Sequence, residues 1–264
     1  MSSLFKFDRE KQRLRSAVAR IDGQTAFVLI AAALLVILQD AIGSRRLFRN
    51  EFAHLFREDW RGLLSWGWWF AIQGLTGFVL PVAALILIFK RRPASIGLGV
   101  GDWRFALAIT AAYLPLVIAG TWVLSDSAAF QLQYPHFRPA AIDWTTFALY
   151  ELLFLAYWMG WEYLWRGFVL FGTAHTLGLY AIFVQAVPFS ILHLDKPLAE
   201  AVLSLIGGVA LGALVWRCRS FWVAVPIHAA QMIILDFWCA VRIRGNVSGL
   251  GPAALRDVWD VLTF

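Results

Sequence analysis

The chain has 264 residues, of which 60% are hydrophobic and 15% are charged, and its formal net charge is +6. Soluble domains are nearer half apolar and a quarter charged, so this composition excludes an ordinary soluble enzyme and indicates an integral membrane protein. The basic residues do not cluster with aromatic residues as they do in nucleic-acid modules, and we expect the lipid bilayer, not nucleic acid, as a partner. The two cysteines, Cys218 and Cys239, have neither metal-ligand spacing nor a disulfide framework.

The first 24 residues are polar and basic, and Leu14, Val18 and Ile21 recur among them at helical spacing. A basic amphipathic helix on an anionic membrane surface explains this pattern, and so does a frayed charged tail. We predict a basic interfacial segment at residues 1–24, followed by a transmembrane helical domain at residues 25–264.

Apolar runs of about 20 residues, the length that crosses a bilayer, recur along the rest of the chain. We predict an all-α, polytopic transmembrane helix bundle with about seven spans, at residues 25–43, 64–89, 103–124, 144–172, 177–192, 197–216 and 221–241. Two further segments, residues 45–60 and 253–262, are amphipathic and predict interfacial helices.

The fourth predicted span contains a pair of opposite charges, Glu162 and Arg166, in the stretch GWEYLWRGFVLFG. Residues at i and i+4 lie on the same face of a helix, so the two side chains can pair. A buried ion pair that fixes helix packing is one explanation, although such a pair offsets its own desolvation poorly. Ionisable residues at membrane depth usually have a function, and a carboxylate beside a cation can act as a general base or a metal ligand.

Two histidines follow in later spans, His193 in PFSILHLDKP and His228 in VPIHAAQMIILDF. Taken alone, His193 is explained by a helix end whose histidine contacts water, whereas His228 stands inside an apolar run. Asp236, two turns after His228, could orient a neighbour or pair with an arginine. Glu151 precedes Glu162 by eleven residues, about 16 Å along a helix, which is too far for direct contact and predicts an interfacial or supporting role.

One glutamate and two histidines on three different spans can converge inside a helix bundle. Glu162, His193 and His228 could hold a divalent metal, zinc in particular, with an open position for water. Alternatively, Glu162 activates water without a metal while a histidine stabilises the oxyanion. Helical spacing does not choose between the two, and both lead to hydrolysis of a peptide bond.

The order of these motifs resembles that of the CPBP family of intramembrane proteases, which includes type II CAAX prenyl endopeptidases and bacteriocin-processing or immunity relatives. The matching segments are WEYLWRGF, FSILHLDKP and VPIHAAQM. The resemblance implies a protease-like core at residues 144–241, with Glu162, His193 and His228 as catalytic residues. Arg166 would hold Glu162 ionised, and Glu151, Trp161 and Asp236 would support the site.

The sequence departs from the usual family pattern at two positions. The family has paired glutamates in the first motif, where this chain has Trp161 before a single Glu162. The third motif usually ends in asparagine, and here the corresponding residue is Met232. The chain is similar to a variant with an aromatic residue before the single glutamate, a His-x-x-Lys-Pro segment that His193 begins, and a later aspartate that Asp236 matches.

The resemblance implies an intramembrane endopeptidase that cleaves a membrane-associated or C-terminally processed peptide, and we expect it in a bacterial cytoplasmic membrane. The alternative is a catalytically inactive immunity or maturation factor on the same scaffold, which would explain the missing first glutamate. A small transporter that uses Glu162 as a proton site ranks last, because no inverted repeat or matching pair of broken helices is present.

Overall fold

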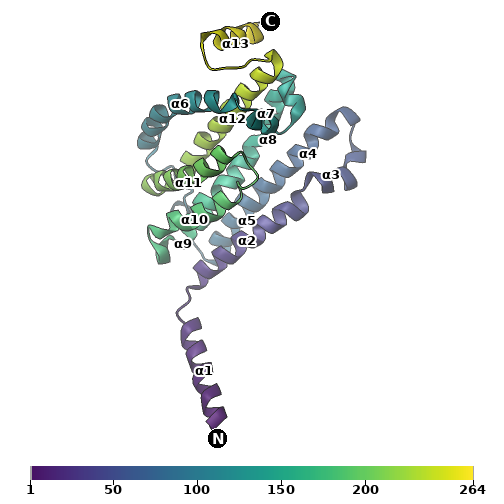
Figure 1. Cartoon of the computed structure of the whole chain (residues 1–264). Helices are drawn as coiled ribbons and strands as arrows, with labels where there is room; N and C mark the ends of the chain where they lie inside the picture. Colours follow the sequence, from purple (N-terminus) through teal and green to yellow (C-terminus); the bar gives the residue numbers. More distant parts are fainter. Residues whose placement is uncertain (1, 264) are drawn as a thin grey trace.

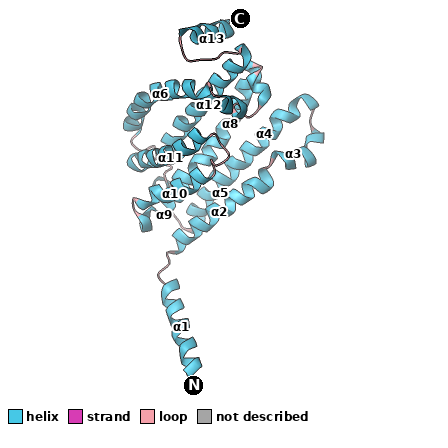
Figure 2. Cartoon of the chain, in the orientation of Figure 1, coloured by secondary structure: helices cyan, strands magenta, loops and turns pink. Residues whose placement is uncertain are grey.

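The structure, a computed structural model, describes residues 2–263 and consists of helices and connecting loops, with no strand in that range (Figures 1 and 2). The α-helices are α1 (Ser2–Val18), α2 (Gly23–Gly43), α3 (Arg45–Glu51), α4 (Glu58–Gly74), α5 (Leu80–Ala83), α6 (Trp103–Ser125), α7 (Ala128–Gln133), α8 (Trp144–Glu162), α9 (Leu170–Leu177), α10 (Tyr180–Ile191), α11 (Leu198–Cys218), α12 (Ala224–Gly245) and α13 (Pro252–Thr263). The predicted all-helical fold is confirmed.

Within residues 2–263, five helical segments are long and apolar enough to cross a membrane, namely Gly23–Glu51, Glu58–Ile88, Trp103–Ser125, Leu198–Cys218 and Phe221–Gly245. The shorter helix α10 is also apolar. The outer faces of the long helices expose large aliphatic side chains, such as Ile30 and Leu34 of α2 and Ile206 of α11. Such extensive apolar exposure suits a surface in contact with lipid. The predicted count of seven spans is not confirmed.

The C-terminal end of helix α8 is buried in the bundle, and α8 packs against α4 on one side and α12 on another. The contact with α4 is a close crossing of backbones at Gly160. A Cβ atom built there would lie 2.8 Å from the Cα of Gly74 and closer still to the carbonyl oxygen of Gln73. Gly77 approaches the backbone of Gly160 in the same way. Small residues allow membrane helices to approach so closely, and this crossing fixes the end of α8 that carries Glu162.

The helical rod does not stop at Glu162. It continues as a π-helical turn from Tyr163 to Val169 and then as α9, so the predicted span at residues 144–172 is one continuous rod. Every residue of the π-helical turn is buried. Such turns are rare and occur often at functional sites, because the extra residue re-aims the side chains around it. Here the turn contains Arg166.

The predicted amphipathic segments differ in outcome. Residues 45–60 do not form a single helix, since α3 ends at Glu51, a 3-10 turn follows at Ala53–Leu55, and α4 begins at Glu58. Acidic residues stabilise the N-terminus of a helix, and those in the first turn of α4 explain why a new helix begins at Glu58. The C-terminal helix is confirmed as α13, and the N-terminal segment forms the helix α1, which extends away from the bundle at the end opposite α13 (Figure 1).

We expect the substitution Gly160→Ala to destabilise the protein by about 1–3 kcal/mol, because the added methyl group meets backbone atoms of α4 that cannot rotate away. Gly120→Ala in α6 is the matched control, because a Cβ atom at Gly120 has no neighbour within 4 Å. The control should melt at or slightly above the wild-type temperature. Thermal unfolding in detergent measures both, and equal melting of the Gly160→Ala variant and wild type would contradict the close crossing.

Candidate active site

Glu162 is in contact with two partners inside the bundle. The Arg166 Nη1 atom donates a hydrogen bond to Glu162 Oε1 at 3.1 Å, and His228 Nδ1 lies 2.6 Å from the same oxygen. The side chains of Glu162 and Arg166 are fully buried, and that of His228 is 10% exposed. Arg166 from the π-helical turn and His228 from α12 therefore meet at one carboxylate oxygen of Glu162, the last residue of α8. A carboxylate beside a guanidinium is favoured in its ionised form, so we assign the hydrogen on His228 Nδ1 to the bond with Glu162.

Aromatic rings enclose this charged group. The guanidinium carbon of Arg166 lies 4.0 Å from the ring centre of Phe189 in α10. The ring of His228 lies 4.4 Å, centre to centre, from Trp158 and 6.0 Å from Phe189. A cation over an aromatic face gains about 2 kcal/mol or more when it is desolvated, which helps to offset the burial of Arg166.

His193 follows α10 and is held by its own backbone. Its Nδ1 atom lies 2.7 Å from the carbonyl oxygen of Phe189, which can only accept, so Nδ1 carries the hydrogen and Nε2 is left as an acceptor. The ring packs 4.7 Å from that of Phe189 and 6.1 Å from that of Trp161. Trp161, in the place of the first glutamate of the family pattern, therefore forms part of an aromatic wall beside His193.

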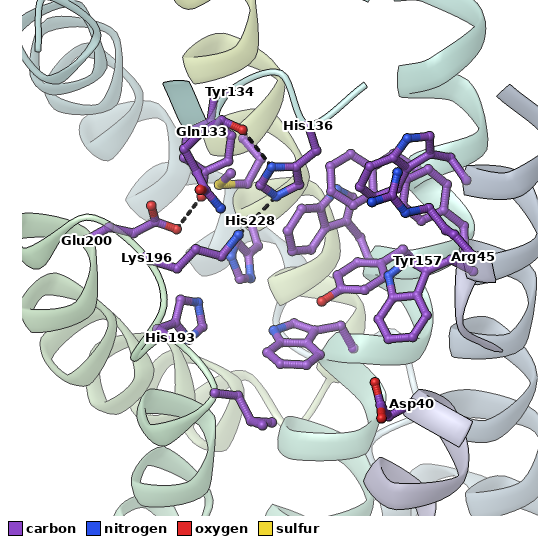
Figure 3. A pocket seen from close by; sticks show the side chains of 18 of the residues that line it. Asp40, Arg45, Gln133, Tyr134, His136, Tyr157, His193, Lys196, Glu200 and His228 are labelled. Atoms are coloured by element: carbon purple, nitrogen blue, oxygen red, sulfur yellow. Dashed lines mark hydrogen bonds between the residues drawn. The ribbon is translucent and has the colours of Figure 1, made fainter. Parts of the chain in front are cut away.

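Two cavities share the histidines. The first, of about 610 Å³, lies beside α4, α8 and the connection between α7 and α8, and polar groups line much of it (Figure 3). The second, of about 430 Å³, lies between α6, α11 and α12 and has mainly apolar walls. Four residues line both cavities: His193, Glu200, His228 and Met232. Glu162 lines neither of these two cavities, but its partner His228 lines both of them and its partner Arg166 lines the apolar one.

The wall of the polar cavity contains Lys196, from the His-x-x-Lys-Pro segment, together with residues that the sequence patterns did not single out. Lys196 Nζ lies 2.9 Å from His136 Nε2, and Figure 3 shows Lys196 reaching toward His136 from the side of Glu200 and His193. Burial lowers the pKa of His136 to about 3, so its ring is neutral and Nε2 accepts the hydrogen bond. The hydroxyl group of Tyr134 donates to Glu200 Oε1 at 2.5 Å.

A stack of rings extends this wall. The ring of His136 lies 4.7 Å from that of Tyr134 and 5.8 Å from that of Trp66, and the guanidinium carbon of Arg45 lies 3.7 Å above Trp66. These residues come from α3, α4 and the α7–α8 connection, so no short motif in the sequence could have revealed them.

The carboxyl groups of Glu151 and Asp236 are neighbours between α8 and α12, close enough to interact electrostatically. Both are buried, and no hydrogen-bond partner is present for either carboxyl group among the described residues. Neither residue lines the two cavities, so the structure separates this pair from Glu162 and joins it to the α8–α12 contact.

The same geometry does not fit a metal ion at Glu162, His193 and His228. Within residues 2–263 no group of three or more histidine, cysteine or acidic side chains is arranged to hold a metal. The one oxygen of Glu162 that faces His228 already accepts from Arg166, and a guanidinium 3.1 Å away would repel a divalent cation at that oxygen.

Removal of Arg166 should lower the free energy of unfolding, because it leaves the buried carboxylate of Glu162 without a cation. We expect Arg166→Met to destabilise the protein by about 3–5 kcal/mol, because Glu162 loses its cation, and a second change, Glu162→Gln, to restore most of that loss. Arg57, in an exposed pair with Asp59, is the matched control, and Arg57→Met should change the unfolding free energy by less than about 1 kcal/mol. Additive effects in the double variant, measured by denaturant unfolding, would contradict the pairing.

Comparison with known proteins was informative for one segment. Residues 142–234 match the family model described as type II CAAX prenyl endopeptidase Rce1-like. No curated protein and no solved structure matches the chain. The matched segment includes Glu162, Arg166, His193 and His228, which are the residues that carried the resemblance in the sequence. The match supports the resemblance of this segment to the CPBP family of intramembrane proteases.

Proposed function

We propose that the protein is an intramembrane endopeptidase that hydrolyses a peptide bond of a membrane-associated or C-terminally processed peptide. The contact between Glu162 and His228, at the boundary of a polar and an apolar cavity, carries this proposal. The Rce1-like family is a protease family, and the five long apolar helices support an integral membrane protein. A hydrolytic site at this depth needs ionisable groups that water can reach, and the histidines provide them.

Each side chain of the site has a role in the proposed reaction. Arg166 holds Glu162 as a carboxylate, and Glu162 accepts the Nδ1 hydrogen of His228 and so fixes the orientation of that ring. The Nε2 atoms of His228 and His193 are then free for the reacting water and the scissile carbonyl group. Trp161 and Phe189 restrict the movement of His193. Glu151 and Asp236 support the site through the contact of α8 with α12.

The two cavities suggest how a substrate is divided between them. The polar cavity suits the peptide backbone and charged groups, since Arg45, His136 and Lys196 line it. The apolar cavity suits large aliphatic groups. A prenylated C-terminal motif and a bacterial leader or sorting peptide both meet this description, and we infer a bacterial cytoplasmic membrane as the location.

The N-terminal helix α1 also supports a location at a membrane. In α1, exposed Phe7, Leu14 and Val18 stand among arginine and lysine residues. Such a helix binds an anionic lipid surface through both its apolar and its basic side chains, and we infer that α1 lies on the membrane surface. The alternative of an inactive immunity or maturation factor is not favoured, because the matching family model is that of an endopeptidase.

The variants Glu162→Gln, His193→Ala and His228→Ala should each lower cleavage by about 100-fold or more, because the two histidines contact the reacting groups and Glu162 orients His228. His54, an exposed histidine in the 3-10 turn after α3, is the control, and His54→Ala should cleave as wild type does. Cleavage is measured by mass spectrometry with the purified protein in nanodiscs, against short peptides with and without an S-farnesyl cysteine.

The amount of protein in the membrane fraction must be compared for all variants, because loss of folding would also remove activity. Full cleavage by the Glu162→Gln variant would overturn the proposal. Cleavage by none of the proteins, wild type included, would remove the endopeptidase assignment itself.

A further inference from the structure

The site needs a group that touches the reacting water and exchanges a proton with it. The position of Glu162 does not suit this task, since its side chain is fully buried and lines neither cavity. Its Oε1 atom is in contact with both Arg166 and His228. A water molecule in either cavity would meet His228 before it could meet this carboxylate.

Glu200 is the carboxylate that faces both cavities. It lies in the first turn of α11 and lines the polar and the apolar cavity together with His193 and His228. The hydroxyl group of Tyr134 donates to its Oε1 atom. Its Oε2 atom is buried and has no hydrogen-bond partner among the described residues. One oxygen is thus held in place, and the other is free.

Two features beside Glu200 stabilise its carboxylate form, which is the form that can accept a proton. The first turn of a helix stabilises a negative charge, and the donor from Tyr134 adds to this effect. Lys196 lies four residues earlier in the same wall, with its ammonium group bonded to His136 rather than to an acidic side chain. No described residue therefore forms a hydrogen bond with Oε2.

We propose that Glu200 is a further catalytic residue, whose free Oε2 atom takes a proton from the attacking water and returns it to the leaving nitrogen. This inference rests on the proposed endopeptidase function. It assigns a proton-transfer role to a residue that lies in neither the first nor the third motif and that the sequence patterns did not indicate.

The reaction balances with these groups alone. The water oxygen forms a bond to the scissile carbonyl carbon while one of its protons passes to Glu200 Oε2, and the carbonyl electron pair moves to the oxygen. The carbon–nitrogen bond then breaks as that electron pair returns, and the nitrogen takes the proton from Glu200. The products are a carboxylic acid and an amine, and Glu200 is again a carboxylate. His193 and His228 hold the water and the carbonyl group during these steps.

Glu200 also has a possible structural role, because its bond with Tyr134 joins α11 to the α7–α8 connection. The variant Glu200→Gln separates the two roles. Glutamine keeps the shape and can still accept from the Tyr134 hydroxyl group, but it cannot take a proton from water. A structural role would survive this change, and a catalytic role would not.

The test uses the full chain in nanodiscs and a farnesylated peptide ending in a Cys-aliphatic-aliphatic-X sequence, with cleavage followed by mass spectrometry. We expect Glu200→Gln to lower kcat by about 100-fold or more while KM and the melting temperature stay near wild type. Glu58, an exposed glutamate in the first turn of α4, is the matched control, and Glu58→Gln should leave kcat unchanged.

A second variant keeps the test decisive if Glu200→Gln unfolds. In Glu200→Ala the carboxylate is absent, and added formate, which is small enough to enter the polar cavity, should restore part of the rate. A wild-type kcat in Glu200→Gln, or no response of Glu200→Ala to formate, would overturn the role of Glu200. The proposed protease function is tested separately, by the loss of cleavage in Glu162→Gln. If wild type itself fails to cleave the peptide, the proposed function and this inference both fall.

Discussion

The structure depends on a single buried carboxylate, that of Glu162, which the fold must compensate within an apolar helix bundle. A charge with no partner at that depth would cost far more than a domain's net stability can absorb. Arg166 supplies the opposite charge from one turn along the same rod, and His228 supplies a hydrogen bond from α12. Phe189 covers the guanidinium group. Four segments are thus required at one point, and their packing follows from that requirement.

The backbone around Glu162 is arranged accordingly. The glycine crossing of α4 and α8 brings the end of α8 into the centre of the bundle, and the π-helical turn after it places Arg166 within reach of both Glu162 and Phe189. The carboxyl pair of Glu151 and Asp236 joins α8 to α12 elsewhere along the two helices. These features orient α8 and α12 toward each other, which the contact between Glu162 and His228 needs.

Local properties of the sequence predicted much of this arrangement. Hydropathy predicted the helical bundle, and the spacing of four residues predicted the pairing of Glu162 with Arg166, because both depend on neighbours along the chain. Contacts that depend on tertiary structure were out of reach. The bond of Tyr134 to Glu200 joins residues 66 positions apart, and the break in residues 45–60 depends on how α3 turns into α4. Amphipathic spacing alone could not choose between a single helix and a helix followed by a turn.

The position of the histidines between two unlike cavities has a consequence for the products. Hydrolysis of a neutral amide creates two ends that are charged at neutral pH, one carboxylate and one ammonium group. Neither end is stable beside the aliphatic side chains of α6 and α11, whereas the other cavity offers charged and hydrogen-bonding groups from Arg45 and Lys196. Hydrolysis therefore changes which cavity the new chain ends prefer. The products leave by moving from the apolar cavity into the polar one.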